Sequence, residues 1–118
     1  MAWQKTLQNR EEIVLVTSSK AGRPNAVVAI SQGFIGRKLL VNDCQMKTTV
    51  RNIKENPAVC VVGRKNGEYY RIKGRARLYP SGRYYKIAAK REQEFKVKNA
   101  IVIEIKEVFD LDKGQKVI

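Results

Sequence analysis

The strongest constraint on the fold comes from one run of residues, EYYRIKGRARLY, at positions 68–79. Side chains on a β-strand point alternately to its two faces, and this run alternates strictly. One face is mostly apolar and consists of Tyr70, Ile72, Gly74, Ala76 and Leu78. The other face is mostly cationic and consists of Tyr69, Arg71, Lys73, Arg75, Arg77 and Tyr79. The run therefore predicts a long strand with one face on a core and the other facing outward.

Five further segments have the composition of strands, and loop or turn signals separate most of them. They are the apolar or β-branched runs at 13–17, 26–31, 39–42 and 58–63, and an alternating run at 99–111. Glycines predict a hairpin at 32–38, and Asn66-Gly67 predicts a tight one. Six short strands joined mostly by short turns favour a closed or nearly closed antiparallel barrel, because closure removes the exposed edges of a small sheet.

Two helices are predicted between these strands. The first lies in NDCQMKTTVRNIKENP, residues 42–57, where three apolar residues have the spacing of one helical face: Met46, Val50 and Ile53. Pro57 ends this helix because proline lacks an N–H and disfavours helical geometry at the residue before it. A second, weaker helical pattern covers 83–94.

Composition limits the class of protein. A length of 118 residues fits a single domain spanning 1–118. Lys and Arg number 24 against 11 Asp and Glu, and the net charge of +13 indicates attraction to an anionic partner without bearing on the fold. No run approaches the roughly 18 apolar residues of a membrane-spanning helix, so we expect a cytoplasmic protein. There, Cys44 and Cys60 are expected to be free thiols.

Histidine is absent from the sequence, which restricts the chemistry of the side chains. Ser-His-Asp and Cys-His nucleophilic sites, the common zinc sites and histidine-ligated haem are excluded or strongly disfavoured. We therefore predict no metal site and assign no catalytic residue. If the protein performs chemistry, a bound cofactor is expected to supply the reactive group.

The start of the first helix is the leading candidate for an anion site. The open N–H groups and the dipole of a helix N-terminus favour an anion, and Lys47, Thr48 and Thr49 add a charge and two hydroxyl donors. Asp43 and Thr48 are both chemically able to cap the helix. These residues fit either a phosphate site or an ordinary capped surface helix.

The cationic face of 68–79 is the second candidate. Its cations, Arg71 to Arg77, span roughly 20 Å with tyrosines at both ends, a pattern that fits single-stranded nucleic acid. A solvated strand face or a subunit contact is the preferred interpretation, since outward strand faces are normally polar and no nucleic-acid motif accompanies this one, so we do not expect nucleic acid as a partner. Cys44 is a third candidate residue. It could have a redox role, or it could be a thiol without a function in the site.

Three segments, in this order and spacing, resemble the small FMN-binding split β-barrel proteins related to pyridoxamine 5′-phosphate oxidase. They are IVLVTSSKAGRPNAVVAIS, LLVNDCQMKTTVRNIKENPAVCVV and YRIKGRARLY, and the resemblance covers about Glu12 to Leu111. It implies a six-stranded antiparallel split barrel with two short helices. It also implies a homodimer that binds FMN at the subunit interface.

The resemblance assigns roles to particular residues. It implies that Lys47, Thr48 and Thr49 hold the FMN phosphate, with Asn52 and Ile53 holding the helix behind them. The remaining implied residues lie along the isoalloxazine ring or line the same groove: Val28, Ala29, Ile30 and Ser31 on the second strand, and Val41, Asn42 and Asp43 at the end of the third.

Two features narrow the expected function. Oxidases that act on pyridoxamine phosphate continue into a C-terminal segment, whereas this chain stops at Val117-Ile118, and haem-degrading relatives use histidine. We therefore expect an FMN-binding redox protein, either a flavin-dependent oxidoreductase or an electron-transfer protein. Its charge would attract an anionic substrate, such as a nicotinamide dinucleotide, or an acidic redox partner. The alternatives are a nucleic-acid-binding barrel that uses Arg71 to Arg77, and a split-barrel scaffold without flavin.

Overall fold

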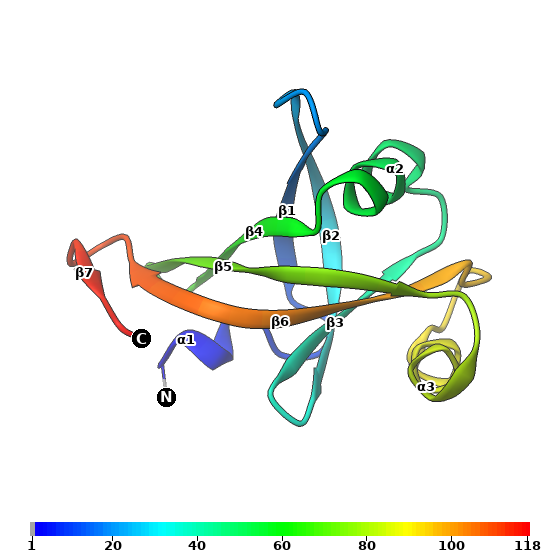
Figure 1. Ribbon diagram of the computed structural model, residues 1–118. Helices are drawn as coiled ribbons and strands as arrows, with labels where there is room; N and C mark the ends of the chain where they lie inside the picture. Colours follow the sequence, from blue (N-terminus) through cyan, green and yellow to red (C-terminus); the bar gives the residue numbers. More distant parts are fainter. Residues whose placement is uncertain (1) are drawn as a thin grey trace.

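Six strands close into an antiparallel barrel in the computed structural model, which describes residues 2–118 (Figure 1). The strands are β1 (Glu12–Ser18), β2 (Pro24–Ile35), β3 (Lys38–Asp43), β4 (Ala58–Lys65), β5 (Glu68–Tyr79) and β6 (Asn99–Asp110). They pair in the order β3-β2-β1-β4-β5-β6, and β3 also pairs with β6, which closes the barrel. The predicted mainly β fold, a six-stranded antiparallel barrel, is confirmed.

The helices lie at the ends of the barrel and over its wall (Figure 1). The two predicted helices are α2 (Lys47–Glu55) and α3 (Gly82–Arg91), although α3 ends three residues before the predicted end at Glu94. The short elements α1 (Ala2–Lys5) and β7 (Gln115–Lys116) were not predicted, because so few residues carry no periodicity. Within residues 2–118, no helix is long and apolar enough to span a membrane.

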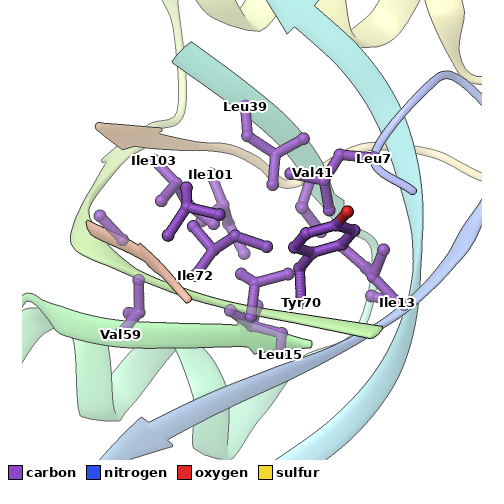
Figure 2. Packing of buried hydrophobic residues seen from close by; sticks show 14 of the residues in the cluster. Leu7, Ile13, Leu15, Leu39, Val41, Val59, Tyr70, Ile72, Ile101 and Ile103 are labelled. Atoms are coloured by element: carbon purple, nitrogen blue, oxygen red, sulfur yellow. The ribbon is translucent and has the colours of Figure 1, made fainter. Parts of the chain in front are cut away.

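Apolar side chains from all six strands fill the barrel interior, as Figure 2 shows for the residues around Ile72 and Leu15. The predicted alternation of inward and outward residues in 68–79 is confirmed. Tyr70, Ile72, Gly74 and Ala76 are buried, and Lys73, Arg75 and Arg77 are exposed. A second apolar cluster lies outside the barrel, where α3 covers the outer face of β3 and β6: Leu40, Ala88, Val97, Ala100 and Val102.

Gly74 permits a close approach of β5 and β6. The register of this pair shifts between Lys73 and Gly74, so that Lys106 has no partner on β5. A Cβ at Gly74 would collide with the carbonyl oxygen of Glu104. Because of this extra residue, the side chains of β6 beyond Lys106 point to the opposite faces from those that a single alternation predicts, and Val108 faces the core. The alternation predicted for 99–111 is therefore wrong at its end.

The hairpin predicted at 32–38 begins later than expected. Strand β2 continues to Ile35, and only Gly36 and Arg37 form the turn. The register of β2 and β3 shifts between Ser31 and Phe34, where Gly33 has a φ of 79°. A bulge that needs a glycine thus lies inside the strand, and in the sequence this glycine looks like a turn signal.

Helix α2 is attached to the barrel by a polar contact and an apolar one. Asn52 donates from Nδ2 to Thr17 Oγ1 on β1 at 3.0 Å, and both residues are buried. Ile53 packs in the main core. The helix ends before Pro57, with the Asn56 N–H bonded to the Asn52 carbonyl at 2.7 Å. These contacts fix the position of the helix start relative to β2 and β3.

Candidate functional site

A pocket of about 250 Å³ opens between β2, the end of β3 and the segment that follows α3. Val28 and Ile30 form its apolar edge on β2, with 69% and 38% of their surfaces exposed. Ala29 also lines the pocket, although its side chain faces the core and is 4% exposed. The complete lining is Arg10, Val28, Ala29, Ile30, Gln32, Asn42, Cys44, Met46, Glu92, Glu94 and Phe95.

Two of the residues expected to follow the cofactor lie behind the pocket. Ser31 and Val41 face each other across the β2–β3 pair, and both are fully buried. The Ser31 hydroxyl donates to the Leu7 carbonyl at 2.6 Å and accepts the Gly33 N–H at 3.0 Å. Val41 belongs to the main core. Their side chains are thus used in fixing the bulge and the barrel wall.

Asp43 shapes the approach to α2. Its Oδ1 accepts the Met46 N–H at 2.7 Å, and its Oδ2 accepts from Asn99 Nδ2 at 2.8 Å. The carboxylate is 2% exposed. Of the two residues able to cap the helix, Asp43 therefore bonds the turn just before it. For Thr48, which is exposed, no side-chain hydrogen bond is formed within residues 2–118.

The start of α2 has the unpaired donors of an anion site. The first helical hydrogen bond runs from the Val50 N–H to the Met46 carbonyl at 2.8 Å, so the N–H groups of residues 47–49 are not used by the helix. Lys47 and Thr48 are exposed, whereas Thr49 is 1% exposed and lies 3.5 Å from Asn25 Nδ2 on β2. The three residues therefore do not all point the same way.

Lys47 lies beside the pocket on β2 and not in it. It lines a neighbouring hollow of about 320 Å³, together with Asp43, Arg51, Lys54 and Lys98. Met46 lines both spaces, which makes them adjacent. Of the predicted site residues, Val28, Ala29, Ile30 and Asn42 meet in the first pocket, Asp43 and Lys47 meet in the second, and Thr48 and Thr49 line neither.

A polar cluster forms the floor of the first pocket. Asn42 donates from Nδ2 to the Ala88 carbonyl at 3.1 Å and to Glu92 Oε1 at 3.2 Å. Asn42 is 6% exposed, and its Oδ1 has no hydrogen-bond partner within the described chain. A buried acceptor without a partner is unfavourable unless a ligand or water supplies a donor. Asn42 thus lines the pocket and carries a buried acceptor that no residue of the described chain satisfies.

Burial and the neighbouring Glu92 both disfavour ionisation of Cys44. The thiol Sγ lies 3.8 Å from Glu92 Oε1, and burial followed by the charge of Glu92 raises the pKa of Cys44 from 9.0 to about 11. Burial opposes the charge on Glu92 itself, but hydrogen bonds from Asn42 and three backbone N–H groups outweigh it and keep the pKa of Glu92 below its usual value. At neutral pH the cysteine is a thiol, which disfavours a redox role.

The sequence did not reveal five of the residues that line the pocket. Arg10, Gln32, Glu92, Glu94 and Phe95 reach it from a loop, a bulge and the turn after α3. The helical pattern to residue 94 concealed that turn. Arg10, with a φ of 79°, bonds through its N–H to the Ser31 carbonyl at 2.8 Å, a contact without a local sequence signal. Within residues 2–118, no cluster of acidic, cysteine or histidine side chains has the arrangement of a metal site.

The predicted cationic stripe on β5 is divided into two halves. The guanidinium of Arg71 lies 4.7 Å from the Phe109 ring centroid, and Lys73 Nζ lies 4.0 Å from Glu107 Oε2. Arg75 and Arg77 are exposed and line a hollow of about 290 Å³ with Lys38 and Tyr79. The stripe is therefore not one uniform surface, and only its second half borders an open hollow.

Comparison with known proteins identifies related chains. The sequence model of the family described as "Pyridoxamine 5'-phosphate oxidase" matches residues 2–112. The uncharacterized protein MJ0282 of Methanocaldococcus jannaschii is 34% identical over 122 residues, which cover 93% of this chain and 78% of that protein.

Solved structures below 25% identity share the fold. HupZ of Group A Streptococcus has a TM-score of 0.86 at 21% identity, over 100% of this chain and 98% of that chain. An FMN-binding protein from Syntrophomonas wolfei has a TM-score of 0.75 at 16% identity, over 92% of this chain and 80% of that chain. An F420 reductase has a TM-score of 0.70 at 20% identity, over 89% of this chain and 94% of that chain. HutZ, a heme storage protein from Vibrio cholerae, has a TM-score of 0.69 at 14% identity, over 92% of both chains.

Proposed function

The chain belongs to the pyridoxamine 5′-phosphate oxidase family, and from this premise we propose that it is an FMN-binding redox protein. The observation that carries the proposal is the adjacency of two spaces. The pocket along β2 and the end of β3 meets the open N-terminus of α2 at Met46. A ligand with a flat, partly apolar ring and a terminal phosphate suits these two neighbouring environments.

The phosphate end would lie at the start of α2. There the ammonium of Lys47 and the free N–H groups of residues 47–49 provide one full charge and several donors. The Thr48 hydroxyl is exposed and adds a donor, whereas Thr49 is buried and contributes through its backbone N–H. Asp43, already bonded to Met46 and Asn99, would hold the turn rather than contact the ligand.

The ring end would lie along β2. Val28 and Ile30 offer apolar contact, and the backbone of Ala29 lines the pocket between them. The unpartnered Oδ1 of Asn42 accepts a hydrogen bond from a ring N–H or a ribityl hydroxyl, which removes the cost of burying it. When bound, FMN supplies a ring that takes up and releases electrons, chemistry that the side chains of this protein lack.

We also propose that the protein is a homodimer. The outer faces of β2, β1 and β4 carry neighbouring apolar side chains, with Val14 opposite both Val28 and Val62. The patch consists of Val14, Val16, Val28, Ile30, Cys60 and Val62. A second copy on this surface would bury the exposed Val28 and close the pocket at its β2 edge, as expected for a cofactor held between subunits.

Flavin fits this chain better than haem, which is named for one of the similar structures. The sequence contains no histidine, the residue that most often ligates haem iron, which disfavours haem.

We also propose a cytoplasmic location. Cys44 and Cys60 are free thiols, which is typical of proteins in a reducing compartment.

A titration with FMN tests the phosphate end. We expect the purified protein to bind FMN at micromolar or lower concentration, measured by quenching of flavin fluorescence. Lys47→Ala removes a charge-assisted contact of about 1.5–3 kcal/mol, so the affinity should fall roughly 10- to 100-fold. Lys86→Ala, an exposed lysine on α3, is the matched control and should bind like the wild type.

The two variants separate two failures. An unchanged affinity in Lys47→Ala removes that lysine from the phosphate site. An absence of FMN binding by the wild-type protein at micromolar concentration overturns the proposed function.

A further inference from the structure

Three neighbouring hollows lie over α2, β5 and the start of β6, and each shares lining residues with the next. The hollow beside Lys47 shares Lys54 and Asn99 with a second one of about 570 Å³. That second hollow shares Ala76, Arg77 and Tyr79 with the third, of about 290 Å³. We call this surface the cationic groove, after seven of its lining residues: Lys38, Lys47, Arg51, Lys54, Arg75, Arg77 and Lys98.

The seven cations of the groove exceed its two acidic residues, although Glu104 lies opposite Lys38 and Arg75 in the sheet and offsets part of their charge. The lining contains Asp43, whose two oxygens are bonded to Met46 and Asn99, and Glu104, which pairs with Lys106 at 2.7 Å. Within residues 2–118, none of the seven cationic groups lies within 4.0 Å of a carboxylate oxygen. The groove therefore has a strong positive potential, which an anionic ligand would relieve.

The spacing of the cations suits a chain of charges better than a single phosphate. Lys47, Arg51 and Lys54 occupy one face of α2 and recur about every 5–6 Å, one helical turn apart. Arg75 and Arg77 are alternate residues of β5 and lie about 6.6 Å apart along the strand. Two rows of cations with similar repeats border the same groove. One terminal phosphate, such as that of FMN, needs only the first of them.

Tyr79 distinguishes a nucleic acid from other polyanions. It lines two of the three hollows, and its ring centroid lies 4.8 Å from that of Tyr84 on α3. Aromatic rings beside a positive groove stack on bases in single-strand binders, and arginine forks fit phosphate oxygens in pairs. Tyr79 is half-buried against Tyr84, and its remaining exposed surface could contact a base, whereas an acidic peptide would use only the cations.

We propose that the cationic groove binds single-stranded nucleic acid, with Arg75, Arg77 and Lys54 on the phosphates and Tyr79 beside a base. This surface differs from the stripe predicted from the sequence, because Arg71 and Lys73 lie outside it. It shares Lys47 with the proposed FMN phosphate site, but Arg75, Arg77 and Tyr79, the residues to be tested, line neither of the two spaces assigned to FMN.

Fluorescence anisotropy with a labelled oligothymidine of about 12 nucleotides tests the proposal on the full-length protein. The wild type should bind at micromolar concentration or tighter, and the affinity should fall steeply between about 50 and 200 mM salt. Arg75→Gln/Arg77→Gln should bind about tenfold more weakly, with a salt slope smaller by about 1.4, that is about 0.7 per lost phosphate contact. Tyr79→Leu should weaken binding without changing the slope.

The control double variant Arg23→Gln/Arg64→Gln removes the same charge from exposed positions outside the groove and should lose less than half the affinity. Both double variants should unfold at the temperature of the wild type. The proposal is overturned if the control loses as much as Arg75→Gln/Arg77→Gln. It is also overturned if polyglutamate, a duplex of equal length or a nucleoside triphosphate displaces the oligonucleotide at equal anion concentration.

Discussion

The outer wall of this barrel has two contrasting parts. Near the middle of β2, β1 and β4 the outward positions carry valine, isoleucine and cysteine, and on the second half of β5 they carry Arg75 and Arg77. Both parts belong to the same antiparallel barrel, and their inward side chains are mostly apolar. The contrast therefore lies mainly in the outward residues, and it is the basis for the two proposed partners: a second copy of the chain for one part and a phosphate-bearing ligand for the other.

Placing a charge on the apolar part should have the largest effect. Val14 lies at the centre of that part, between Val28 and Val62. In the proposed dimer, Val14→Asp would bury an unpaired charge at a cost of about 3–5 kcal/mol, so dimer affinity should fall by more than roughly 100-fold. Light scattering after size-exclusion chromatography at several protein concentrations measures the fraction of dimer. Arg75→Asp is the control and should leave assembly intact, whereas dissociation of both variants, or of neither, contradicts the assignment of the two parts.

A change at the boundary between the two halves of β5 should have an intermediate effect. Gly74 lies at the register shift, and a methyl group there meets the Glu104 carbonyl. Gly74→Ala should destabilise the fold by about 1–3 kcal/mol, which corresponds to a lower melting temperature by roughly 5–15 °C. Thermal unfolding followed by circular dichroism measures it, with the exposed Arg75→Ala as control. A melting temperature equal to that of the wild type would show that β5 and β6 can separate there without cost.

The smallest expected effect concerns Cys44 in the pocket. Because its pKa is raised to about 11, alkylation by iodoacetamide should stay slow at pH 8 and accelerate only as the pH approaches 11. Glu92→Gln removes a neighbouring negative charge and should lower this pKa, increasing the rate at pH 8 several-fold. Measurements in a Cys60→Ser background isolate the thiol. A slower reaction in Glu92→Gln would contradict the proposed control by Glu92.

The same raised pKa has a consequence for stability. The folded state holds the Cys44 proton more tightly than the unfolded chain does, so this contribution to stability is complete below pH 9.0 and is lost as the pH rises toward about 11. Replacing Cys44 by serine should remove that part of the pH dependence.

The sequence predicts the parts of this fold that depend on local periodicity. The alternation at 68–79 correctly placed Ile72 inside and Arg75 outside, and the apolar spacing before Pro57 correctly predicted a helix, α2, within residues 42–57. The bulge at Gly33 was read as a turn because a positive φ favours glycine in both settings.

The candidate site was less accessible to sequence reasoning because long-range contacts build it. Asn42 meets Ala88 across 46 positions and Glu92 across 50, and Arg91 donates to the Gln32 carbonyl across 59. Periodicity carries no information at such separations. The segments on β2 and β3 were identified through family resemblance, whereas Glu92 and Phe95 follow only from the closed barrel and the turn after α3.

The visible absorption spectrum of the purified protein tests the central claim most directly. We predict a yellow protein whose flavin bands persist through desalting, and a chromophore with the mass of FMN after denaturation. A colourless protein that stays colourless after incubation with FMN and desalting would contradict the account, and so would a released chromophore with the mass of F420 or haem.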